Sequence, residues 1–78
     1  MVISLRILAF ASAAEQIGAR ERTITCSTTD LPRQIIARLG LLCDERVTRV
    51  AVDGEYHPWD APIGRATELA IIPPVCGG

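Results

Sequence analysis

The chain has 78 residues, of which 49% are hydrophobic and 22% charged, a composition typical of one folded domain with a small core. Its formal net charge of −1 gives no support to nucleic-acid binding, and no apolar run is long enough to span a bilayer. All eight basic residues are arginines, so the chain has no lysine through which copies of it could be linked.

The cysteines are odd in number and fit no C-x-x-C spacing: Cys26, Cys43 and Cys76. A disulfide framework is therefore not expected, and a reducing cytoplasm is the simpler setting. We predict that Cys26 and Cys43 are small buried hydrophobes. A zinc site built from the three cysteines and His57 is the less favoured alternative, so we predict no metal.

The first expected element is a strand over Val2–Ala9, which is rich in β-branched residues and alternates imperfectly. Its core-facing residues are predicted to be Ile3, Leu5, Ile7 and Ala9. Leu8 and Phe10 then lie on the outer face, where adjacent apolar side chains suggest a surface for a partner. The segment is similar to a signal peptide, but Arg6 interrupts it and the core needs the strand, so we predict no cleavage.

The next elements are shorter. Ser12–Ile17 can form a short helix that ends at Gly18. Arg22–Cys26 is a second strand, with Ile24 and Cys26 directed inward.

The main helix is expected to begin close to Pro32, with the polar run at 27–30 supplying its capping residues, and to end at Leu39 before Gly40. Its buried stripe recurs at helical spacing: Leu31, Ile35 and Leu39, with Ile36 beside them.

A hairpin follows the helix. Leu41–Val47 can hold one short helical turn, and Thr48–Val52 is a strand. Asp53 and Gly54 form a dipeptide typical of hairpin turns, which makes Glu55–His57 a short edge strand.

Prolines at 58 and 62 exclude regular structure from the next segment. We expect Trp59 to hold this loop to the body and His57 to be a surface or loop-packing histidine. The turn Gly64–Thr67 leads into the last strand, Glu68–Ile72.

These elements predict an α+β fold in which one main helix packs on one face of a mixed sheet. The first and last strands have the strongest apolar runs, so we place them centrally and parallel. Residues 1–72 would form the domain, and residues 73–78 a flexible tail.

The tail has the sequence Pro73-Pro74-Val75-Cys76-Gly77-Gly78. Two prolines end strand pairing and favour an extended path, because proline fixes φ and has no N–H. The glycines have no Cβ, so they can enter a narrow channel. This pattern favours a carboxylate that other proteins activate over a merely frayed end.

The residues from Leu69 to Gly78 resemble the end of the small, ubiquitin-like subunit of molybdopterin synthase, the MoaD family. An apolar strand, Pro-Pro-Val, one small residue and Gly-Gly are typical of that family. The resemblance extends more weakly over the whole chain and implies a β-grasp fold.

By this resemblance the chain is a sulfur carrier in molybdenum cofactor biosynthesis. An E1-like enzyme would use ATP to adenylate Gly78, and a sulfur donor would convert the adenylate to a thiocarboxylate. The large subunit of molybdopterin synthase would then pass the sulfur to cyclic pyranopterin monophosphate. The chain itself would bind no cofactor and has no catalytic site of its own.

The resemblance implies roles for the residues of the tail and for one face of the domain. Gly78 carries the sulfur and Gly77 provides clearance, while the path of the tail is set by Pro73, Pro74, Val75 and the small residue Cys76. The docking surface for the large subunit would include Phe10, Leu8 and Ile72.

Two departures from the family limit this picture. Ile71 and Ile72 replace a common aromatic pair, which weakens an aromatic anchoring role there. Arg65–Thr67 replaces an acidic turn, which weakens an electrostatic docking role for that turn, although Glu68 remains. The alternatives are a sulfur carrier for another product such as the thiamine thiazole, a ubiquitin-like protein modifier, or a plain interaction module.

Overall fold

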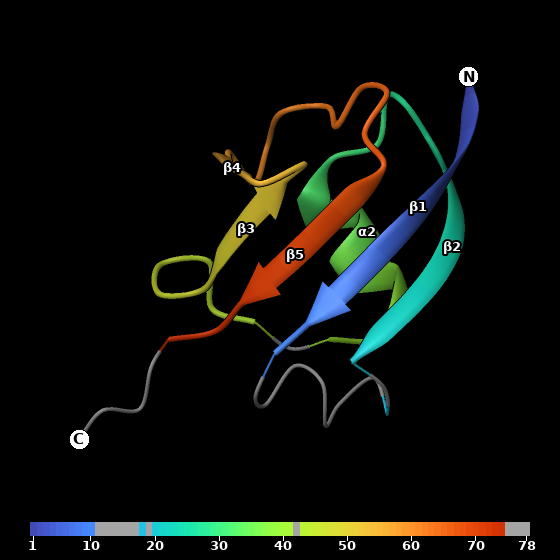
Figure 1. Ribbon diagram of the computed structural model, residues 1–78. Helices are drawn as coiled ribbons and strands as arrows, with labels where there is room; N and C mark the ends of the chain where they lie inside the picture. The colour runs from blue at the N-terminus through green and yellow to red at the C-terminus, as the bar shows by residue number, and fades with distance from the viewer. Residues whose placement is uncertain (11–17, 19, 42, 75–78) are drawn as a thin grey trace.

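A computed structural model describes residues 1–10, 18, 20–41 and 43–74, and the account below concerns these residues. The predicted short helix Ser12–Ile17 lies outside them. The described elements are β1 (Val2–Ala9), β2 (Glu21–Ser27), α2 (Pro32–Arg38), β3 (Arg49–Val52), β4 (Glu55–His57) and β5 (Glu68–Ile72) (Figure 1).

The five strands form one mixed sheet in the order β2-β1-β5-β3-β4. β1 and β5 are parallel neighbours, with Ile7 paired to Leu69 and Ala9 to Ile71. The other neighbouring strands are antiparallel. The prediction that the first and last strands are central and parallel is therefore confirmed.

Helix α2 covers one face of the sheet (Figure 1). The core between them contains five side chains with no exposed surface: Leu5, Ile7, Ile35, Leu69 and Ile71. Alternate residues of β1 and β5 supply four of these, as the period of two in a strand requires. The predicted inward phase of both strands is confirmed.

The start of α2 differs from the prediction. Its N-cap is Leu31, which makes no side-chain capping bond; instead the Leu31 N–H donates to the Gln34 side chain at 2.9 Å. The polar run at 27–30 does not cap the helix, because Asp30 accepts the N–H of Ser27 and pairs with Arg38. A local motif predicted the helix correctly but not the partner of its first amide.

The other end of α2 agrees with the prediction. Leu39 is the C-cap, and Gly40 follows with a φ of +76°, a left-handed conformation that glycine adopts without steric cost. The segment before β3 contains one turn, in which the Thr48 N–H donates to the Asp44 carbonyl at 2.8 Å.

The β3–β4 hairpin has the predicted turn, with φ of +50° at Asp53 and +85° at Gly54. Left-handed φ at both central residues suits the twist of a two-residue hairpin. Beyond β4, the Trp59 ring N–H donates to the Thr48 carbonyl at 3.1 Å, and a His57 ring nitrogen lies 3.0 Å from the Ala61 carbonyl oxygen. Trp59 therefore holds the loop to the body and His57 packs against the loop, both as predicted.

Candidate docking face and C-terminal tail

The sheet face opposite α2 has an apolar half. Phe10 follows β1 and is 51% exposed, while Leu8 and Ile72 are half-buried. The predicted outward phase of these three residues is confirmed, although their role is not tested by their position alone.

Strand pairing places further apolar side chains in the same region. Leu8 pairs with Ala70, Ala70 with Ala51, and Ala51 with Tyr56, so one row crosses four strands. Phe10 comes directly after the Ala9–Ile71 pair and so lies beside Ile72. We call this surface the tail-end face: Leu8, Phe10, Ala51, Tyr56, Ala70 and Ile72.

Tyr56 is 74% exposed and was not among the residues predicted for this face. The available signal was the alternation within Glu55–His57, which places Tyr56 and His57 on opposite faces of the edge strand. The residues that lie beside Tyr56 across the sheet, however, depend on which strands pair.

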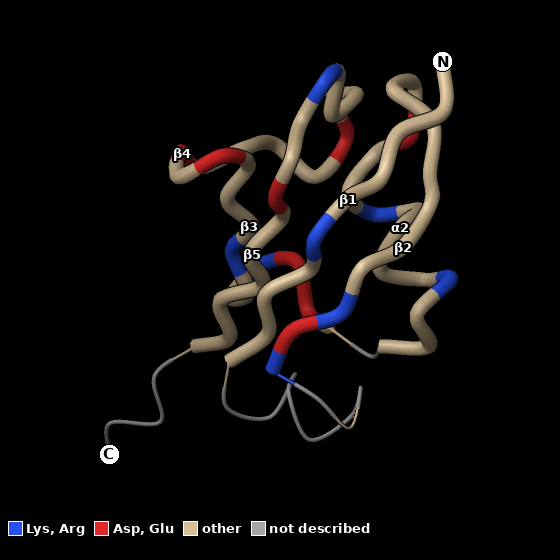
Figure 2. Tube along the Cα trace, turned by 45° about the vertical axis from the view of Figure 1, so that its right-hand side comes forward, with Lys and Arg blue, Asp and Glu red and all other residues tan. Residues whose placement is uncertain are grey.

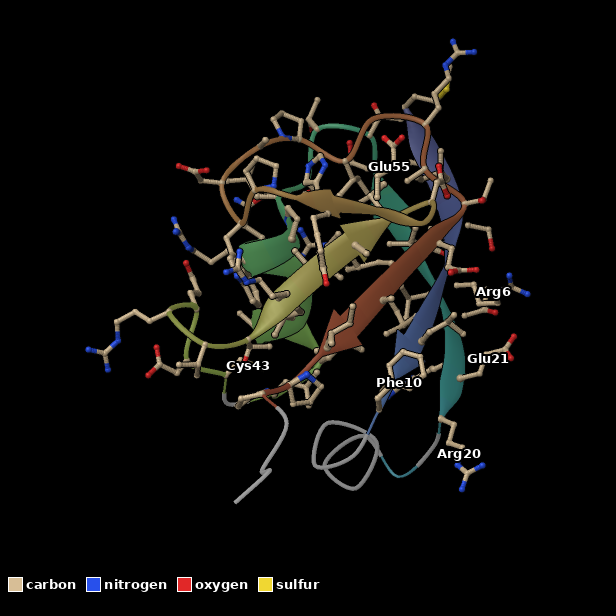
Figure 3. All side chains as sticks on the ribbon, turned by 60° about the vertical axis from the view of Figure 1, so that its left-hand side comes forward. Arg6, Phe10, Arg20, Glu21, Cys43 and Glu55 are labelled. Carbon is tan, nitrogen blue, oxygen red and sulfur yellow. The ribbon has the colours of Figure 1, made fainter. Side chains whose placement is uncertain are left out.

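Charged side chains form one border of the tail-end face. The Arg6 guanidinium lies 2.7 Å from Glu68 and 3.8 Å from Glu21, so it joins β1 to both of its neighbours. Figure 2 marks the basic and acidic positions along the backbone, and Figure 3 shows the Arg6 and Glu21 side chains next to each other. The Glu68 hydrogen bond, followed by the charge of Glu21, raises the pKa of Arg6. Because the group is exposed, the pairs add little to stability and mainly mark where the apolar surface ends.

The tail leaves the sheet beside this face. β5 ends at Ile72, Pro73 is half-buried and Pro74 is exposed. Figure 1 shows that β1 and β5 end on the same side of the molecule. Because Ala9 pairs with Ile71, Phe10 lies near the start of the tail. Val75, Cys76, Gly77 and Gly78 lie outside the described residues, and their predicted roles stay predictions, as does the division of the chain at residue 73.

The two described cysteines are not activated thiols. Cys26 is 5% exposed and Cys43 is half-buried, and burial raises the pKa of both. A raised pKa keeps a thiol protonated and therefore weakly nucleophilic.

Two features are absent from the described ranges. These ranges contain no group of three or more histidine, cysteine or acidic side chains placed to hold a metal ion. No helix within them has both the length and the apolar character needed to cross a membrane.

A hollow of about 330 Å³ lies at the β3–β4 flank of the tail-end face. The residues that line it are Glu45, Arg49, Val50, Tyr56, His57, Pro58 and Trp59. Tyr56 therefore belongs to both surfaces, and Arg49 pairs across the sheet with Ile72 at the root of the tail.

Comparison with known proteins gives consistent results at the level of sequence. Residues 7–78 match the model of the ThiS family. Two curated relatives are named molybdopterin synthase sulfur carrier subunit: one from Caenorhabditis briggsae, 38% identical, and one from Caenorhabditis elegans, 34% identical. Each alignment covers 99% of this chain and 100% of the relative.

Among solved structures, the small archaeal modifier protein 1 of Haloferax volcanii matches with a TM-score of 0.75 over 97% of this chain and 100% of that chain. Its sequence identity of 21% supports a shared fold only. The predicted ubiquitin-like β-grasp fold is thereby confirmed. With a family model that covers all but the first six residues and relatives that align over their full length, the chain belongs to the ThiS family.

Proposed function

We propose that this chain is the sulfur carrier subunit of a molybdopterin synthase. The observation that carries the proposal is the apolar tail-end face beside β5, the strand that leads into Pro-Pro-Val-Cys-Gly-Gly. Such a surface can bind a partner while the narrow terminus enters that partner's active site. The two full-length relatives named for this role support the same function.

The chemistry takes place at the Gly78 carboxylate. A carboxylate is a poor electrophile, so its oxygen attacks the α-phosphate of ATP on an adenylating enzyme, which forms an acyl adenylate and releases pyrophosphate. Sulfide released by a sulfur donor then attacks the acyl carbon and displaces AMP, which leaves a thiocarboxylate. The nucleophilic sulfur forms a bond to a carbon of the pterin precursor in place of an oxygen. Water then cleaves the acyl–sulfur bond, which returns the carrier to its carboxylate form.

This cycle assigns three partners to the chain. They are an E1-like adenylating enzyme, a sulfur donor and the large subunit of the synthase, which would bind the tail-end face through Phe10, Leu8 and Ile72. ATP is bound by the adenylating enzyme, and this chain binds no cofactor. A reducing, cytoplasmic compartment suits both the free thiols and the thiocarboxylate.

Intact mass spectrometry tests the proposal. The protein is produced in cells with its adenylating partner, beside a variant that lacks Gly77 and Gly78. Full-length protein should gain about 16 Da, the exchange of one oxygen for sulfur, in an acyl substitution at the terminus. The shortened variant should show no gain. Addition of the large subunit and the pterin precursor should then remove the added mass.

Two results would contradict the proposal. One is the absence of a mass gain in the presence of a working adenylating enzyme. The other is a gain that the large subunit and pterin precursor do not reverse, which would indicate a carrier for another sulfur pathway.

The second candidate is a protein modifier, which the fold similarity to the archaeal modifier protein brings into consideration. It uses the same activated terminus but transfers the acyl group to an amine. Larger adducts joined through Gly78 in the same mass spectra would favour it.

A further inference from the structure

We infer that Arg49 and the adjoining hollow extend the docking face, and that the large subunit of the synthase fills them with a carboxylate and an apolar side chain. This inference rests on the proposed function. Arg49 is the first residue of β3 and pairs with Ile72, the last residue of β5. Arg49 therefore lies at the root of the tail, and its side chain starts on the same face of the sheet as Ile72.

Arg49 is exposed and has no ion pair or side-chain hydrogen bond within the described part of the chain. The acid that could have neutralised it is Glu45, which lines the same hollow. Both oxygens of Glu45, however, accept hydrogen bonds of 2.7 Å from Arg33. Within the described residues, therefore, no acidic side chain neutralises Arg49, and we assign its positive charge to a partner.

The opposite border of the tail-end face is different, because Arg6 is already paired with Glu68 and Glu21. A partner that covers the face gains nothing electrostatic at that border. Covering Arg49 without a counter-charge would instead cost free energy, since a desolvated charge needs a partner. Charge complementarity therefore directs the interface toward β3 and requires an acidic side chain there.

The hollow beside Arg49 is preformed. Its Trp59 wall is fixed by the hydrogen bond from the ring N–H to the Thr48 carbonyl, and His57 is held against the Ala61 carbonyl. A partner side chain can enter between Tyr56 and Trp59 without first ordering the loop that carries Trp59. This lowers the entropic cost of binding. Because the hollow adjoins the tail-end face that the proposed function assigns to the large subunit, the large subunit is its expected occupant.

The test compares four purified proteins: wild type, Arg49→Glu, Arg49→Met and the control Arg65→Glu. Arg65 is exposed and precedes β5, at the end of that strand remote from Ile72, so it receives the same change of charge away from the proposed contact. The Kd for the purified large subunit is measured by calorimetry at low and high salt. Thermal unfolding of each variant establishes that it is folded.

Arg49→Glu should weaken binding about tenfold or more, because a repulsive pair replaces an attractive one. Arg49→Met should weaken it less and should reduce the salt dependence of the Kd. Arg65→Glu should bind like the wild type. Sulfur loading by the adenylating enzyme, followed as the gain in intact mass, should be unchanged in Arg49→Glu.

Three results would overturn the inference: wild-type affinity in Arg49→Glu, an equal loss in Arg65→Glu, or a loss of sulfur loading as large as the loss of binding. The last result would place the carboxylate on the adenylating enzyme. If the wild type itself neither binds the large subunit nor gains sulfur, the proposed function fails, and this inference fails with it. If the wild type binds the large subunit and gains sulfur, a contrary result in the variants counts against this inference and not against the proposed function.

Discussion

Asp53 shows how one residue of the hairpin turn fixes the start of a distant strand. Its carboxylate oxygen Oδ1 accepts three hydrogen bonds, from the Thr67 N–H, the Thr67 hydroxyl and the Glu68 N–H, at 2.8–3.0 Å. These bonds, with the Thr67 backbone bond the largest cause, lower the pKa of Asp53. The sequence indicates a turn at this position but not the partners of its side chain.

We predict that Asp53→Ala lowers the free energy of unfolding by about 1–3 kcal/mol at neutral pH, since three donors lose a charged acceptor. The lowered pKa means that this stabilisation is present above the unfolded-state pKa, near 3.9, and is lost as the pH falls through the folded-state pKa. The difference between wild type and variant should therefore shrink in acid. Urea unfolding at neutral and acidic pH measures it.

Asp53→Asn is the matched control, because asparagine tolerates the left-handed φ and keeps an acceptor oxygen but has no charge. It should retain part of the stability and lose the pH dependence. An Asp53→Ala variant as stable as the wild type at neutral pH would show that the three bonds contribute nothing.

At the scale of one element, the side chains of β1 alternate between the core, where they contribute to stability, and the tail-end face, which is proposed for docking. Ile7 has no exposed surface and packs in the core, whereas the next residue, Leu8, lies on the tail-end face. Adjacent residues of a strand point to opposite faces, so neighbouring substitutions should have different consequences.

We predict that Ile7→Ala costs about 2–5 kcal/mol of unfolding free energy, because it leaves a cavity in a small core. Leu8→Ala should cost clearly less but should weaken binding of the large subunit. Denaturant unfolding and calorimetric titration of the same two variants measure both effects. An equal loss of stability in the two variants would contradict the observed phase of β1.

At the scale of the whole molecule, the parallel pairing of β1 and β5 places the two ends of the described chain far apart. Met1 is 68% exposed before the start of β1, while Pro74 follows the end of β5 on the opposite side of the sheet (Figure 1). The docking face lies near Pro74, at the end of the sheet where β1 and β5 finish. Additions at the two termini should therefore affect function differently.

We predict that a short peptide added before Met1 leaves sulfur loading unchanged, whereas one residue added after Gly78 abolishes the gain in mass. The added residue moves the carboxylate and introduces a side chain where the channel accepts glycine. Both proteins should unfold at the temperature of the wild type. Sulfur gain by the C-terminally extended protein would show that the reactive carboxylate is elsewhere.

The sequence by itself determined the local features: the described strands, the helix beginning at Pro32, the stop at Gly40 and the Asp53–Gly54 turn. It could do so because periodicity, proline and glycine act over a few neighbouring residues. It also indicated which side chains of β1 and β5 face inward, and the tail motif on which the resemblance rests.

Only the tertiary structure decided which distant residues meet. It placed Arg49 beside Ile72, tied Glu45 to Arg33 across 12 positions and joined Asp53 to Thr67 across 14. It also extended the docking face to Tyr56 through Ala70 and Ala51. These contacts depend on strand order and on competition among donors and acceptors for one partner, and no local pattern encodes either.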